Sequence, residues 1–156
     1  MKPFIKKIIF VGTIVLVLIQ FYQPARNSDY GQVLPIHFSK IYPVPQNVEA
    51  ILQTSCYDCH SNNTRYPWYS NIQPMRFFMD GHISEGKDDL NFSEWGNYSK
   101  RKQETKLNRM IKQIKDNKMP LSSYTLIHRD AILDSTQKKL LTTWLESVND
   151  SIAKNN

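Results

Sequence analysis

Both cysteines of the chain lie in one pentapeptide, Cys-Tyr-Asp-Cys-His, at residues 56–60. Two thiols three residues apart on a helical turn can reach neighbouring vinyl groups of a porphyrin and form thioether bonds with them. The histidine that follows directly can then coordinate the iron as its proximal ligand. The spacing therefore predicts one covalently attached c-type haem, with thioethers to Cys56 and Cys59 and with His60 on the iron.

Three other kinds of site also use closely spaced cysteines. A thiol redox motif normally accompanies a βαβ pattern, which this sequence lacks. A structural zinc site usually needs four ligands, and no second Cys or His pair stands at a zinc-like spacing. A short disulfide would leave the adjoining His60 unexplained. Haem attachment accounts for all three residues, and these alternatives remain open to test.

The sixth iron ligand is a separate question. Met119 is the first candidate, because Lys118-Met119-Pro120 follows a predicted helix and begins a loop. Proline restricts the local backbone, which helps to present the thioether in one geometry, and such a loop resembles the distal-ligand loop of small c-type cytochromes. His82 is the second candidate and His128 a third. An open or water-ligated position is the remaining possibility.

Aromatic and basic side chains follow the attachment motif closely. Arg65 can pair with a haem propionate, because guanidinium and carboxylate groups form strong charge-assisted hydrogen bonds. Tyr66, Trp68 and Tyr69 can form an apolar wall for the haem, or they can simply pack on neighbouring helices. Tyr124 has the same two interpretations.

The composition indicates one small globular domain. The chain has 156 residues, of which 40% are hydrophobic, so wholesale disorder is excluded. Lys2, Lys6 and Lys7 supply half of the net charge of +6, and no basic stripe remains for phosphates. We therefore expect no nucleic-acid partner. The sequence has no hydrolase constellation and no phosphate-binding glycine loop, so we do not expect an enzyme.

The first 22 residues have the pattern of a membrane signal. Residues 8–22 are almost uncharged and follow Lys6 and Lys7, which directs the rest of the chain outward. The stretch predicts a transmembrane or signal helix over 1–22. Ala25 offers a poor cleavage context, which favours an uncleaved anchor. We expect a protein tethered by this helix to the inner membrane and facing the periplasm, or free in the periplasm if the signal is cleaved.

The remaining patterns predict an all-α fold. Residues 23–47 contain four prolines and are expected to form an extended linker. Residues 48–150 are expected to form a small cytochrome c-like helical domain with long loops, followed by a disordered tail at 151–156. Apolar spacing predicts helices over 48–56, 74–86 and 103–117, and a last helix that starts at the capping pair Asp134 and Gln137.

From about residue 48 to residue 145, the chain resembles the bacterial haem-binding domain family, which is c-type cytochrome-like and typical of Bacteroidetes-type envelope proteins. The resemblance rests on CYDCHSNNTRYPWYSNIQP at 56–74, HISEGKDDLNFSEW at 82–95 and MPLSSYTLIHRDAILD at 119–134. It implies a single covalently attached haem c on Cys56, Cys59 and His60.

The residues themselves favour electron transfer to or from a redox partner protein, with His60 and Met119 saturating the iron. The alternative is a small-ligand sensor or a peroxidase-like protein with an open sixth position.

Overall fold

The computed structural model describes residues 3–154. Within this range the regular structure is helical apart from one isolated antiparallel bridge between Ser28 and Asn63. The all-α prediction is therefore confirmed. The α-helices are α1 (Pro3–Ile19), α2 (Phe38–Ile41), α3 (Gln46–Ser55), α4 (Tyr57–His60), α5 (Met75–Asp89), α6 (Lys100–Lys115), α7 (Ser122–Thr125) and α8 (Ser135–Lys154), and the 3-10 helices are η1 (Trp68–Asn71), η2 (Phe92–Asn97) and η3 (Arg129–Ala131).

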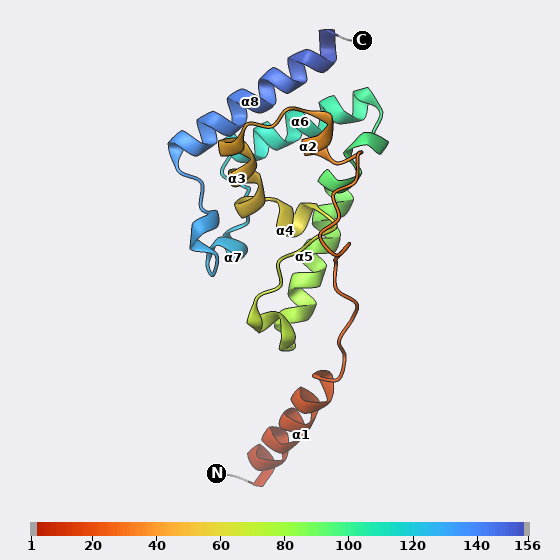
Figure 1. The fold of residues 1–156 in the computed structure, drawn as a ribbon. Helices are drawn as coiled ribbons and strands as arrows, with labels where there is room; N and C mark the ends of the chain where they lie inside the picture. Colours follow the sequence, from red (N-terminus) through yellow and green to blue (C-terminus); the bar gives the residue numbers. More distant parts are fainter. Residues whose placement is uncertain (1–2, 155–156) are drawn as a thin grey trace.

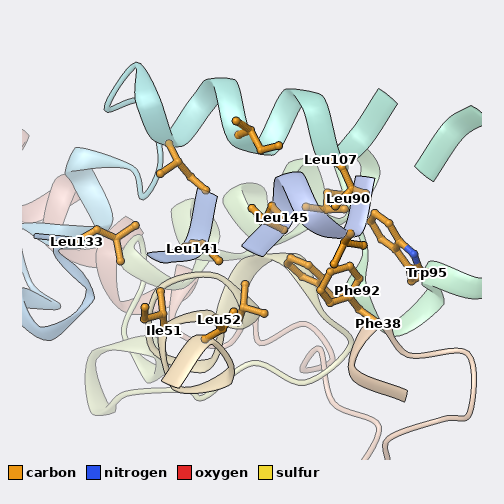
Figure 2. Packing of buried hydrophobic residues seen from close by; sticks show 14 of the residues in the cluster. Phe38, Ile51, Leu52, Leu90, Phe92, Trp95, Leu107, Leu133, Leu141 and Leu145 are labelled. Carbon is orange, nitrogen blue, oxygen red and sulfur yellow. The ribbon is translucent and has the colours of Figure 1, made fainter. Parts of the chain in front are cut away.

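The core lies between α6, α8 and α3 (Figure 1). Leu107 of α6 and Leu141 and Leu145 of α8 are fully buried there. Figure 2 shows these side chains together with Leu52 of α3. Burial of each such side chain stabilises the fold by about 1.5–3 kcal/mol. α3, which leads directly into the cysteine motif, is therefore packed into this core.

The last helix begins as predicted. The Gln137 amide donates to Oδ1 of Asp134 at 2.7 Å, and the Asp134 amide donates to Oε1 of Gln137 at 3.0 Å. This reciprocal pair satisfies two amides that a helix start leaves free. α8 continues to Lys154 with Ile152 buried, so the predicted tail at 151–156 is helical as far as Lys154. Residues 155–156 lie outside the described residues, as do the first two residues of the predicted signal segment.

The segment at 23–47, for which the sequence predicts a linker, lies against the helical domain. Phe38 is fully buried, with ring centroids 4.7 Å from Trp95 and 5.1 Å from Phe92 (Figure 2). The Gly96 amide donates to the Ile36 carbonyl at 2.8 Å. The segment therefore contributes one of the largest side chains of the core and is part of the folded unit.

The predicted transmembrane helix over 1–22 is wrong. Among residues 3–154, no helix is long and apolar enough to cross a membrane. α1 covers the 17 residues Pro3–Ile19. Its first turns also contain Lys6 and Lys7. α1 extends away from the other helices (Figure 1) and none of its side chains is buried.

Candidate functional site

The imidazole of His60 is held in one orientation by the helix that follows in the chain. Its Nδ1–H donates to the carbonyl oxygen of Gly86 at 2.7 Å, and the carbonyl oxygen of Leu90 lies 3.1 Å from the same nitrogen. Because carbonyl oxygens only accept hydrogen bonds, Nδ1 carries the proton. The lone pair of Nε2 is then free to bind a metal ion. His60 therefore has the tautomer that a proximal iron ligand requires.

Gly86 permits the contact that orients His60. A Cβ atom at this position would lie 2.7 Å from the carbonyl oxygen of Cys59, closer than a side chain tolerates. The absence of a side chain at Gly86 therefore allows α5 to approach α4 this closely. The predicted helix over 74–86 ends at this glycine, whereas α5 continues to Asp89. Gly86 is thus needed for the close packing of α5 on α4 and does not end the helix.

The motif residues border two adjoining cavities. Cys56, His60 and Met119 line both of them, together with Pro120. The first encloses about 750 Å³ of non-atom space, with the open solvent at its mouth included. Its apolar wall consists of Leu90, Phe92, Met110, Ile114 and Leu133. The second cavity adds Cys59, His82 and Tyr124, so both thiols, the imidazole and Met119 border one space.

Both cysteines are free thiols. Burial raises the pKa of Cys56 to about 12 and that of Cys59 to about 11, so both stay protonated at neutral pH. Thiol–disulfide exchange depends on the thiolate, which disfavours the redox-motif interpretation. No group of three or more His, Cys, Asp or Glu side chains within residues 3–154 is placed to hold a metal ion, which disfavours the zinc interpretation. Two thiols at a cavity wall remain available for thioether formation.

The candidates for the sixth ligand fall into two groups. Met119 and His82 both line the second cavity. His128 lies on a third cavity instead, where its Nε2 is 2.5 Å from the hydroxyl of Tyr69. Met110, which the sequence places only in the apolar stripe of α6, lines the first cavity beside Met119. The side chains of Met110, Met119 and His82 therefore border the two cavities that His60 lines.

Arg65 lies apart from the first two cavities and is engaged elsewhere. Its Nε donates to Oδ1 of Asp58 at 3.0 Å, and a terminal nitrogen donates to Oδ2 at 3.1 Å. The cations that do line the first cavity are Lys106 and Arg109 on α6. Lys106 donates to the carbonyl of Asp89, and burial lowers its pKa. The sequence gives no sign of the position of these two residues, because a helical charge pattern does not show which side chains reach a cavity.

The aromatic residues after the motif have different surroundings. The hydroxyl of Tyr66 accepts a hydrogen bond from the Asn27 amide at 2.7 Å, and its ring lies 4.7 Å from the Arg76 guanidinium. Trp68 is 76% exposed. Tyr69 lines the third cavity, whereas Tyr124 lines both the second and the third. Of these predicted wall residues, Tyr124 is the one that shares a cavity with His60.

A family model described as a haem-binding domain matches residues 14–147. The match includes Cys56, Cys59, His60 and Met119. No curated protein and no solved structure matches the chain.

Proposed function

The chain belongs to the haem-binding domain family, and on that basis we propose that it is a monohaem c-type cytochrome that transfers electrons. The observation that carries the proposal is the hydrogen bond from His60 Nδ1–H to the Gly86 carbonyl. It fixes the tautomer with a free Nε2, and His60 lines a cavity that Cys56 and Cys59 also line. These three groups are the ones that covalent haem attachment uses.

Each protein group has a distinct task in this proposal. Cys56 and Cys59 hold the haem through thioethers, and the apolar wall of the first cavity excludes water from it. The Gly86 carbonyl orients the His60 imidazole and raises its basicity toward iron. When bound, the haem supplies a one-electron couple at its iron.

Met119 is the proposed sixth ligand. The amides of Lys118 and Met119 both donate to the Gln113 carbonyl, at 2.9 and 3.3 Å, so the loop is fastened to the end of α6. Thioether ligation raises the reduction potential of haem, which suits an electron carrier. A saturated iron also leaves no position for a substrate, so we propose a carrier and not an enzyme.

We also propose that the protein works in the cell envelope. Covalent attachment of haem to a Cys-x-x-Cys-His motif normally takes place outside the cytoplasm, and the reduced thiols of Cys56 and Cys59 are the substrates of that attachment. A redox partner protein there would supply or remove the electron.

The test is expression with cytochrome maturation machinery, followed by haem staining on a denaturing gel. We expect staining of the natural protein and loss of staining when both Cys56→Ala and Cys59→Ala are present. Equal staining of the double variant would overturn covalent attachment. The ferrous spectrum with and without carbon monoxide then separates the functions. A spectrum that ignores carbon monoxide supports electron transfer, whereas a prompt shift points to sensing or peroxidase chemistry.

A further inference from the structure

A buried carboxylate lies inside the attachment motif. Asp58 is only 7% exposed, and burying a charge is costly unless it is paired. Its carboxylate accepts hydrogen bonds from the Tyr124 hydroxyl at 2.7 Å, from Arg65 Nε at 3.0 Å and from the Arg65 amide at 3.1 Å. The charge is thus compensated by Arg65, which is close in sequence, and by Tyr124, which is 66 residues away.

The Tyr124 hydrogen bond joins the two parts of the chain that carry the proposed iron ligands. Asp58 lies between the two cysteines, on the same helical turn as His60. Tyr124 lies on α7 (Ser122–Thr125), which starts directly after the Met119–Leu121 stretch. The other end of this stretch is fastened by the Gln113 carbonyl. Met119 therefore lies between one anchor on α6 and one anchor on the attachment turn.

A second set of contacts holds the Tyr124 ring itself. The ring stacks on His128 with centroids 4.3 Å apart and an interplanar angle of 15°. His128 is in turn bound to the Tyr69 hydroxyl. Burial and the nearby Asp58 raise the pKa of the Tyr124 hydroxyl, so it remains a proton donor at physiological pH. The ring position and the donor are both fixed.

We propose that Asp58 and Tyr124 are positioning residues, whose hydrogen bond docks the Met119 segment on the attachment turn and keeps the thioether on the iron. This inference rests on the proposed His60 and Met119 ligation. In this proposal Asp58, one of the two residues between the motif cysteines, has a role that is separate from haem attachment. Without the hydrogen bond, the segment between Gln113 and α7 gains freedom, and the sixth position opens more often.

The test compares Tyr124→Phe with a matched control in the haem-loaded protein. Tyr124→Phe keeps the ring and its stacking but removes the donor. Tyr42→Phe is the control, because its hydroxyl also joins distant segments, donating to Oε1 of Gln103 at 3.0 Å, and it does not line the three cavities. The readouts are the weak long-wavelength ferric absorption of iron–thioether ligation and the rate at which the ferrous protein binds carbon monoxide.

We expect Tyr124→Phe to weaken the ferric band and to bind carbon monoxide about tenfold faster, a ratio equivalent to about 1.4 kcal/mol of lost docking. Tyr42→Phe should match the natural protein in both. Asp58→Asn keeps an acceptor oxygen for Tyr124 but loses the charge, so its effect should be smaller than that of Tyr124→Phe.

The outcomes separate this inference from the function on which it rests. If the natural protein lacks the ferric band, Met119 ligation fails and the inference falls with it. If the natural protein has the band and Tyr124→Phe leaves the band and the carbon monoxide rate unchanged, the inference alone is overturned. A lower melting temperature of Tyr124→Phe with an unchanged spectrum also overturns it, since the hydrogen bond would then serve only stability.

Discussion

Gly86→Ala places a methyl group where α5 meets α4. The new Cβ would lie 2.7 Å from the carbonyl oxygen of Cys59 and 3.2 Å from its Cβ. The oxygen belongs to the backbone of the attachment turn, so rotation of a side chain cannot relieve the contact. Either α5 or α4 has to move.

The cost follows from that movement. Restoring an ordinary contact of 3.4 Å requires a displacement of about 0.7 Å. The bond from His60 Nδ1–H to the Gly86 carbonyl is 2.7 Å, and the same displacement along it would exceed the usual limit of about 3.2 Å. Overpacking costs about 1–3 kcal/mol and the hydrogen bond about 0.5–1.5 kcal/mol, offset by about 1 kcal/mol of better helix propensity. We expect a net loss of about 2 kcal/mol in the free energy of unfolding.

The assay is urea unfolding of the haem-free protein, with Gly81→Ala as the control. Gly81 lies on the same helix, and nothing lies within 4 Å of a Cβ built there. Gly81→Ala should therefore stabilise the protein by up to about 1 kcal/mol through propensity alone. If Gly86→Ala stabilises the protein as Gly81→Ala does, the packing of α5 on α4 does not require a glycine at position 86, and the reasoning is refuted.

Three further changes test other parts of the structure. Phe38→Ala should cost about 3–5 kcal/mol in urea unfolding, because the ring is fully buried; a cost below about 1 kcal/mol would remove segment 23–47 from the core. Burial lowers the pKa of His37 below its ordinary 6.5, so the unfolded chain binds the proton first and stability falls as the pH drops below 6.5. Melting curves at several pH values should show a smaller fall in melting temperature with decreasing pH for His37→Asn than for the natural protein. An identical fall would show that His37 is not the source of the pH dependence. Lys106→Leu should lower the reduction potential in a potentiometric titration, because the buried cation on the cavity wall disfavours the ferric charge; the same shift in Lys102→Leu, outside the three cavities, would show that only net charge matters.

Local signals in the sequence were sufficient for α3, α6 and the start of α8. The Asp134–Gln137 pair predicts the start of α8 because both partners of the capping box lie within one turn. The apolar spacing near residues 48–56 and 103–117 predicts α3 and α6 for the same reason. The attachment motif is also local, because five consecutive residues contain the thiols and the imidazole.

The features that escaped prediction depend on partners distant in sequence. The role of Gly86 could not be predicted, since its contact with Cys59 exists only after α5 folds back on α4. Asp58 gave no signal, because Tyr124 meets it across 66 residues. The burial of Phe38 was missed because a proline-rich segment shows no periodicity. The transmembrane prediction was wrong, since no helix within residues 3–154 meets both the length and the apolarity that a membrane span needs.

The central claim is that one covalently bound haem is ligated by His60 and Met119. The most direct measurement is the ferric absorption spectrum of the natural protein, Met119→Leu and Met110→Leu, with covalent haem checked on a denaturing gel. Met110 and Met119 both line the first cavity, so Met110→Leu controls for removal of a methionine sulfur atom there. We expect the iron–thioether band in the natural protein and in Met110→Leu, and its loss in Met119→Leu. Absence of the band from the natural protein, or its loss in Met110→Leu alone, would contradict the account.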